Sequence, residues 1–370
     1  MKLSVKGLVL FTSAVIALSA ITGCSGSEGS SSSSAVDASS GAAKSSGSED
    51  AGKELVVVSW GGANQDAQRE SIFKAFEKKT GVKIKEDSPT DYGKLTAMVN
   101  SGNVEWDVVD CDADFVPRGI KEGLLEKLDF NVIDKTDLDT SLTTDYSVGA
   151  ELYAVAISYD TTTFPTGKQP TTWAQFWDTK SYPGGRALWK YAPSTLEIAL
   201  LADGVKPEEL YPLDVERAFK SLDKIKKDIN VWWTTGAQPA QLLTDNEVAL
   251  AGAWNGRITS AKEQGASVDV EFNQSILMAD SWVVVKGAPQ KDLAMKFIAF
   301  AIAPEQQANY AKLIPYGVVN SKAYDLLDEA TKAKMASSPE KRPKQIMLDV
   351  NYWLDNYDTI NERFQNWLIK

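Results

Sequence analysis

From Glu54 onward the sequence alternates apolar runs with amphipathic segments, and this alternation constrains the fold more than any other feature. The first run, residues 54–60 (ELVVVSW), ends in Gly61-Gly62, as expected of a buried parallel strand that leads into a turn. Asn64 is placed to cap the helix that follows, and Gly81 is placed to end it. The unit is therefore strand, glycine-rich turn and helix.

Similar units with different sequences recur along the rest of the chain, and no fixed period indicates a repeat protein. Alternating strands and helices predict an α/β fold with parallel strand pairing. The number of units favours two lobes over one very wide sheet. Further strands are predicted at residues 82–86, 107–109, 152–158, 187–189, 231–233, 248–253 and 281–286, and helices at residues 92–100, 172–177, 193–200, 215–227 and 292–301.

The first residues have the pattern of an export signal. Lys2 and Lys6 precede an uncharged, mostly apolar stretch over residues 7–20, which is too short to span a bilayer comfortably. Ile21-Thr22-Gly23 directly before Cys24 matches the lipobox of bacterial lipoproteins, in which the cysteine carries the lipid. We expect a signal peptide over residues 1–23 and lipidation of Cys24, with ordinary secretion and an incidental cysteine as the alternative.

Residues 24–53 are rich in serine and glycine, a composition that cannot bury enough apolar surface to offset the ordering of the chain. They predict a flexible tether between the lipid and the globular part. A single acyl chain anchors only marginally, so the two or three chains of a lipoprotein matter.

Charge and composition exclude several classes of function. Without Lys2 and Lys6, 37 of the 39 basic residues remain against 50 acidic ones, a net charge of about −13 that argues against nucleic-acid binding. The two cysteines form no disulfide framework, because Cys24 carries the lipid. The absence of histidine removes Ser-His-Asp catalysis and most zinc sites. We expect no enzyme activity, no metal and no cofactor.

Several segments, taken in order, resemble one family. They are VSWGG, DVVDCDADFVPRGI followed by GLLEKLD, LYAVAISYDTTTF, TTWAQFWD, VALAGAWNGRI, DSWVVVKGAPQKDLAMKFIAF and PYGVVNSKA. This set is similar to the extracellular solute-binding proteins of ABC importers, in the branch of spermidine/putrescine-binding proteins. The resemblance implies an α/β, two-lobed clamshell of the periplasmic-binding-protein type II, with hinge crossover strands near residues 152–159 and before Asp280.

The resemblance also implies an arrangement of parts and partners. Lobe 1 would comprise residues 54–156 and 277–318, and lobe 2 residues 157–276 and 319–370. The partners would be a small amine or amino-acid-like ligand and an ABC permease with its ATPase. The protein would be a monomer held outside the cytoplasm on the cell membrane by its lipid.

Ligands are expected at the strand ends that face the cleft. Trp60 ends the first strand, where its indole can stack on an alkyl-ammonium group or close the core, and Gly61 lets backbone approach a ligand. Asp110 and Asp112 follow the third predicted strand, with Cys111 turned inward between them. Capping or solvated loop charges are the alternative for the two acids.

The tetrad that contains Trp254, Asn255 and Arg257 follows an apolar strand and precedes a short helix. The family's polyamine binders resemble it at Trp and Gly but carry aspartate where this chain has Arg257. An arginine in the first helical turn opposes the helix dipole and needs an anion, and its guanidinium fits a carboxylate. A bridge from Arg257 to a protein carboxylate is the alternative.

Asp280 matches an acid that contacts the ligand amine in the family's putrescine-binding members, or else it pairs with Arg257. Trp282 follows it, and Tyr159 and Tyr316 are further candidates for contact with the alkyl part of a ligand.

Arg257 and Asp280 together specify a zwitterion such as 4-aminobutyrate or an opine-like derivative, in preference to a polyamine. A surface sensor of the same fold and, less favoured, a hydrolase using Asp110 and Asp112 remain as alternatives.

Overall fold

The computed structural model describes residues 49–370, which lie within one compact unit. The predicted signal peptide over residues 1–23, the lipidation site Cys24 and most of the predicted tether over residues 24–53 lie outside the described residues. Within the described part, Asp50 is 6% exposed and pairs with Lys296 at 2.6 Å. The chain therefore contacts the folded body before the predicted end of the tether.

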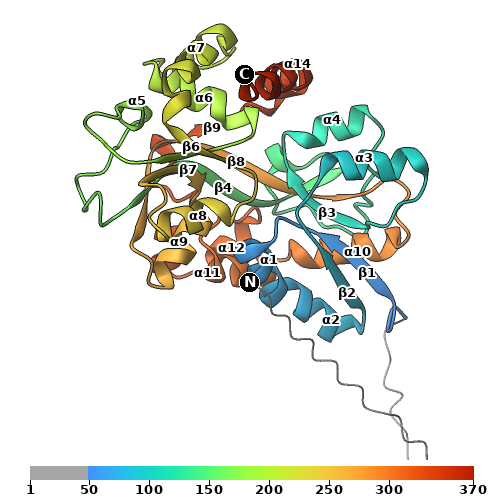
Figure 1. Ribbon diagram of the computed structural model, residues 1–370. Helices are drawn as coiled ribbons and strands as arrows, with labels where there is room; N and C mark the ends of the chain where they lie inside the picture. The colour runs from blue at the N-terminus through green and yellow to red at the C-terminus, as the bar shows by residue number, and fades with distance from the viewer. Residues whose placement is uncertain (1–48) are drawn as a thin grey trace, which may run out of the picture. The chain divides into compact units, whose positions relative to one another are not determined.

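Nine strands form one mixed sheet in the order β2-β1-β3-β8-β4-β7-β5-β6, with β9 beside β8 (Figure 1). Two long strands, β4 (Ser147–Asp160) and β8 (Val268–Val284), pair antiparallel with each other and pass through the middle of the sheet. The shorter strands are β1 (Glu54–Val58), β2 (Lys83–Asp87), β3 (Val108–Asp112), β5 (Arg186–Trp189), β6 (Ile229–Trp233), β7 (Leu250–Trp254) and β9 (Ile346–Met347).

The helices that matter for the site are α1 (Gly62–Gln68), which continues through a π-helical turn into α2, and α9 (Asn255–Glu263). The others are α2 (Lys74–Thr80), α3 (Tyr92–Ser101), α4 (Phe115–Lys121), α5 (Trp173–Trp177), α6 (Ala192–Ala202), α7 (Val215–Ile225), α8 (Gln238–Thr244), α10 (Lys291–Ala301), α11 (Pro304–Leu313), α12 (Ser321–Asp325), α13 (Glu329–Lys334) and α14 (Val350–Leu368).

Separate hydrophobic cores lie on the two sides of the long strand pair. In Figure 1, β1 to β3 with α2, α3, α4 and α10 lie on one side, and β5 to β7 with α5 to α9 lie on the other. The first group encloses two core clusters around Phe73 and Phe115, and the second encloses one large cluster around Trp233. The α/β clamshell architecture is confirmed, with β4 and β8 as the long crossover strands. The lobe boundaries stay a prediction.

The apolar runs located most of the predicted strands and helices to within a few residues, but several details differ. β8 begins at Val268 and not at residue 281, and the helices α4, α8 and α11 to α14 were not predicted. The strand pairs β3-β8, β4-β7 and β4-β8 are antiparallel, whereas parallel pairing was predicted. The third strand was predicted to end at residue 109, whereas β3 runs through Asp112 because Asp110 and Asp112 pair with Trp282 and Asp280 of β8. Both acids thus lie within the strand and not after it.

Asn64 does not cap α1, which begins at Gly62. Its side chain turns inward to the acids of the sheet. Gly81 ends α2 in a left-handed conformation, as predicted. The Thr172 side chain caps α5, at the start of the helix predicted over residues 172–177.

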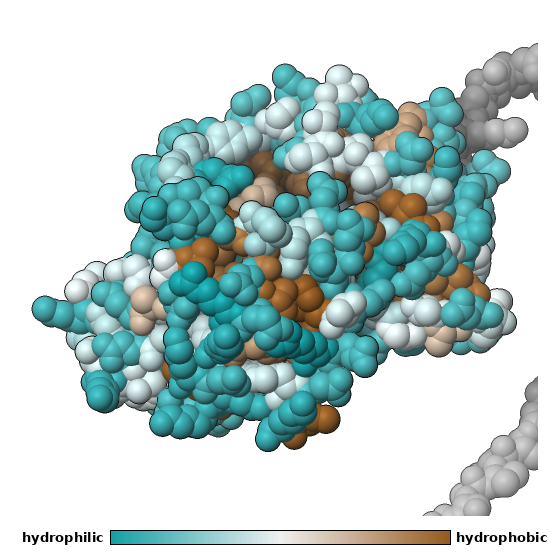
Figure 2. Space-filling model, turned by 90° about the horizontal axis from the view of Figure 1, so that it is seen from above, coloured by the Kyte–Doolittle hydropathy of each residue, from teal (hydrophilic) through white to brown (hydrophobic). Residues whose placement is uncertain are grey.

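The surface seen in Figure 2 is mostly hydrophilic, and apolar residues appear mainly in its hollows. This agrees with the burial of the large apolar side chains in the cores. No helix between residues 49 and 370 combines the length and the apolar character needed to cross a bilayer.

Candidate ligand-binding site

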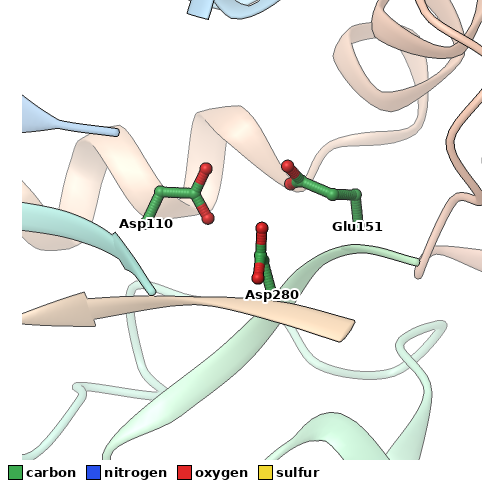
Figure 3. Close-up of side chains that lie close together, drawn as sticks. All are labelled: Asp110, Glu151 and Asp280. Atoms are coloured by element: carbon green, nitrogen blue, oxygen red, sulfur yellow. The ribbon is translucent and has the colours of Figure 1, made fainter. Parts of the chain in front are cut away.

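Three carboxylates meet where the central strands β3, β4 and β8 lie side by side. The register places Glu151 of β4 opposite Asp280 of β8, and Asp110 comes from β3 on the other side of β8. Figure 3 shows the three side chains pointing toward one another. One oxygen atom from each lies within 4.8 Å of the other two, and none of the three residues is more than 4% exposed.

Asp110 is held by neutral donors. Its Oδ2 accepts hydrogen bonds from Ser59 Oγ at 3.0 Å, from Gln68 Nε2 at 2.7 Å and from Asn64 Nδ2 at 3.5 Å, whereas its Oδ1 is buried without a partner. Burial raises the pKa of Asp110 to about 7, although these hydrogen bonds act in the opposite direction.

Glu151 and Asp280 complete the group. Oε1 of Glu151 lies 3.2 Å from Asn64 Nδ2 and 3.0 Å from the hydroxyl of Tyr310. Oδ1 of Asp280 is buried without a hydrogen-bond partner. Burial, followed by the charge of Asp110, raises the pKa of both carboxyls well above the ordinary range. Within the described residues, no cationic group forms an ion pair with these carboxylates.

A narrow cavity of about 10 Å³, with room for about one water molecule, adjoins the acids. Its walls are aromatic: Trp60 and Trp254 meet edge to face with ring centroids 5.8 Å apart, and Tyr153 lies at the same distance from Trp254. The cavity is lined by Trp60, Asn64, Tyr153, Trp254, Arg257, Asp280 and Tyr316. Ligand pockets for drug-sized molecules are about 300 to 1,000 Å³, so the walls of this cavity must move apart to admit a solute.

Arg257 supplies the one guanidinium among the residues that line this cavity. It is 3% exposed, and Nη1 donates to the carbonyl oxygen of Gly61 at 2.5 Å. Nε and Nη2 are buried without hydrogen-bond partners, and no carboxylate within the described residues lies within ion-pair distance of the guanidinium. The predicted alternative of a bridge to Asp280 is therefore not formed.

Gly61 and Gly62 allow this approach of Arg257 to the backbone. Both have positive φ, at 65° and 54°. A Cβ atom on Gly62 would lie 2.8 Å from Nη1 of Arg257, so a side chain at this position would displace the guanidinium. The glycine pair thus positions Arg257 through the Gly61 carbonyl group.

The structure brings five of the predicted site residues, Trp60, Trp254, Arg257, Asp280 and Tyr316, to one cavity. Asp110 lies beside it in the carboxylate group. The remaining predicted residues are placed around them as described next.

Asp112 lies behind the cavity wall, where its carboxylate accepts hydrogen bonds from Tyr92 at 2.6 Å and Tyr153 at 2.8 Å. Asn255 joins the crossover strand to the loop that carries Tyr316, because its side chain bonds the Ala154 amide and the Pro315 carbonyl group. Both residues support the site without lining it.

Two predicted residues lie away from the cavity. Trp282 packs edge to face on Phe297 in the core on the β3 side, with ring centroids 5.6 Å apart. Tyr159 is buried in the large cluster around Trp233, near the far end of β4. Cys111 is buried in an apolar cluster, as predicted.

Asn64, Glu151 and Tyr153 belong to the site but were not identified from the sequence. Glu151 and Tyr153 alternate along β4 and so share a face, and an acid directly before the strand predicted at residues 152–158 was the available signal. For Asn64 the helix start suggested a cap, and nothing in the sequence indicated that its side chain turns inward.

We expect the ligand-free protein to lose stability as the pH rises from about 5 to about 8. Burial raises four carboxyl pKa values far above the unfolded values of about 4, so the folded protein holds protons that the unfolded chain has released. Their stabilisation is complete below the unfolded pKa values and is lost as the pH passes the folded ones. The four are Asp110 at about 7, Asp112 at about 6, Asp114 at about 8 and Glu197 at about 7.

Melting temperatures at pH 5, 6.5 and 8 measure this effect. Carboxyls with lowered pKa values, such as Asp87 and Glu126, are ionised in both states over this range, so their contribution to the free energy of unfolding stays constant. The chain has no histidine to obscure the trend. A melting temperature that stays level or rises between pH 5 and pH 8 would contradict the assignment of buried, protonated acids.

Comparison with known proteins places this geometry in context. The model of the family described as bacterial extracellular solute-binding protein matches residues 71–341. A gamma-aminobutyric acid-binding protein of Pseudomonas aeruginosa is 36% identical over 332 residues, which cover 88% of this chain and 94% of that protein.

Two further proteins extend the comparison. The solved structure of a GABA receptor is 44% identical with a TM-score of 0.77, and the match covers 85% of this chain and 98% of the other. A spermidine/putrescine-binding periplasmic protein of Haemophilus influenzae is 26% identical, with 78% of this chain and 81% of that protein covered.

Proposed function

Because this chain belongs to the bacterial extracellular solute-binding protein family, we propose that it binds a small zwitterion such as 4-aminobutyrate and delivers it to an ABC permease. The observation that carries the proposal is the pair of unmatched charges at one cavity. Arg257 has two buried nitrogens without partners, and Asp280 has a buried oxygen without one. Buried charges are costly unless paired, and a ligand with a carboxylate and an ammonium group pairs both.

The cavity walls suit the chain between those two ligand groups. Trp60, Trp254 and Tyr153 surround it with ring faces and edges, and Tyr316 lies next to Tyr153 with centroids 5.9 Å apart. Aromatic walls contact methylene groups and favour a nearby cation. Names among the relatives agree with this ligand class, since the Pseudomonas protein binds gamma-aminobutyric acid.

A polyamine is the second candidate, favoured by the three carboxylates and by the Haemophilus relative. Against it stands Arg257, which would face a second ammonium group across the cavity. Like charges brought together in a buried interface cost several kcal/mol, so the zwitterion is the better match.

We further propose that a lipid on Cys24 and the tether over residues 24–53 hold the protein near its permease. The support is the lipobox pattern and the Ser/Gly composition of the sequence. Metabolic labelling with a fatty acid, compared between the native chain and Cys24→Ser, tests the anchor. Equal labelling of the two would contradict it.

Thermal shift with a panel of amines, amino acids and polyamines tests the binding function. A ligand at about 100 times its Kd stabilises the folded protein by about 2.7 kcal/mol, which raises Tm by several degrees. We expect this shift with 4-aminobutyrate and little shift with butyrate or butylamine, each of which lacks one charged group. No shift with any member of the panel would overturn the solute-binding proposal.

A further inference from the structure

The carboxylates of Asp110, Glu151 and Asp280 converge, and the guanidinium of Arg257 acts on them only from beyond ion-pair distance. Their hydrogen-bond partners within the described residues are Ser59, Asn64, Gln68 and Tyr310, all of which are neutral. No lysine or arginine within residues 49–370 forms an ion pair with any of the three. Three ionised carboxylates in contact and out of water repel each other, so the empty site must hold at least one proton.

Counting hydrogens around Tyr310 identifies where that proton is. The Tyr310 hydroxyl contacts both Oδ1 of Asn64 and Oε1 of Glu151, but it carries a single hydrogen. The Asn64 amide is oriented by its Nδ2, which faces Oδ2 of Asp110 and Oε1 of Glu151. A reversed amide would place Oδ1 of Asn64 against two carboxylate oxygens. The Tyr310 hydrogen therefore goes to Oδ1 of Asn64.

The Tyr310 oxygen and Oε1 of Glu151 lie 3.0 Å apart. Because the Tyr310 hydrogen is already used, a hydrogen bond between these two oxygens requires a hydrogen on Glu151. In this arrangement the carboxylic acid of Glu151 donates to the Tyr310 oxygen and still accepts from Asn64. Asp110 is the better candidate for the ionised form, because three donors converge on its Oδ2. The geometry thus distinguishes a neutral Glu151 from an ionised Asp110.

The charges that face Glu151 from the surrounding elements shift its pKa in opposite directions. Asp110 of β3 and Asp280 of β8 favour its protonated form, and Tyr310 of α11 contacts it directly. Arg257 of α9 favours its ionised form, as does the hydrogen bond from Asn64. Burial is the largest influence, and together with Asp110 it holds the pKa of Glu151 well above the ordinary range.

The same three oxygens suit an ammonium group. The three oxygens all lie within 4.8 Å of one another, so a point between them can lie no more than about 2.8 Å from each, the length of a hydrogen bond between an ammonium and a carboxylate. A primary ammonium group has three hydrogens to donate. Its charge offsets the repulsion that keeps the proton on Glu151.

We propose that the ligand's ammonium group binds between Asp110, Glu151 and Asp280 in exchange for a proton that Glu151 holds in the empty protein. The inference rests on the proposed binding of an amine. The ligand enters as the ammonium ion, the O–H bond of Glu151 breaks and its proton passes to the solvent. The site's charge therefore stays constant when the ammonium arrives, and affinity rises with pH by up to tenfold per unit while Glu151 is protonated in the empty protein.

Calorimetric titration of the full chain in detergent with 4-aminobutyrate at pH 7 measures the exchange. Phosphate and Tris differ in ionisation enthalpy, so the difference between the observed heats gives the number of protons released. We expect a release close to one proton. Binding with equal heats in the two buffers would overturn the exchange while leaving the binding function intact. An absence of binding heat would overturn the proposed zwitterion function instead.

Two variants assign the proton to Glu151. Glu151→Gln keeps the shape and neutrality of the protonated acid, so we expect it to bind with little proton release. The control is Glu197→Gln, because Glu197 is also a fully buried glutamate with a raised pKa but bonds Tyr211 and Trp353 in another part of the fold. It should release the same number of protons as the native protein. Native-like release from Glu151→Gln would overturn the assignment.

Discussion

Replacing Arg257 with methionine is expected to weaken the binding of 4-aminobutyrate by roughly 30- to 4,000-fold, because a ligand carboxylate would lose its only buried counter-ion among the cavity residues. This corresponds to about 2 to 5 kcal/mol, the usual cost of truncating one partner of a buried charge pair. Methionine keeps most of the apolar stem of Arg257 and loses the guanidinium, whose carbon lies 5.7 Å from the centroid of the Trp254 ring. Titration calorimetry at pH 7 measures the change.

Lys262→Met is the matched control, since Lys262 lies on the same helix but is exposed and pairs with Asp269. Its affinity should equal that of the native protein. Arg257→Asp gives a second comparison, because reversal of the charge should transfer preference from 4-aminobutyrate to putrescine. If this variant kept its preference for ligands with a carboxylate, Arg257 would not be the anion site.

Replacing Asp280 with asparagine is expected to change affinity and stability in opposite directions. The ligand ammonium loses a charged partner, so affinity should fall by about 2 kcal/mol or more, roughly 30-fold. The empty protein loses a buried carboxylate whose Oδ1 has no partner, so its melting temperature should rise by about 1 to 2 °C. Calorimetric titration and thermal unfolding of the same preparation measure both effects.

Asp112→Asn is the control for these opposite effects on melting temperature and affinity. Asp112 is equally buried, but its carboxylate accepts hydrogen bonds from two tyrosines, so the amide leaves one of them poorly paired. We therefore expect a lower melting temperature for Asp112→Asn, the opposite sign to Asp280→Asn. A decrease of similar size in both variants would show that Asp280 is a structural residue.

The sequence predicted the fold better than the site, for a physical reason. Apolar runs such as residues 54–60 and 248–253 report burial directly, so β1 and β7 could be located from the sequence to within two residues at each end. The end of β3 could not be located, because Asp110 and Asp112 are polar residues that are buried only through pairing with β8. A strand extended by tertiary pairing leaves no local signal.

The residues of the candidate site also depend on tertiary pairing that the local sequence does not report. Trp254, Arg257 and Asp280, which line the candidate cavity, were predicted because a resemblance to a known family and unfavourable charge placement marked them. Glu151 was missed because its importance comes from β4 lying beside β8, which brings it opposite Asp280. Trp282 was included because it follows Asp280, but it packs in the core, where ring size and apolarity are the decisive properties.

The central claim is that one cavity pairs an anion with Arg257 and an ammonium group with the acids around Asp280. Titration calorimetry with 4-aminobutyrate and putrescine, on one preparation at pH 7, tests it most directly because the two ligands have similar length and differ in the charge at one end. We predict micromolar or tighter binding of 4-aminobutyrate, about 8 kcal/mol or more, and binding of putrescine at least about 100-fold weaker. Equal or tighter binding of putrescine would contradict the claim.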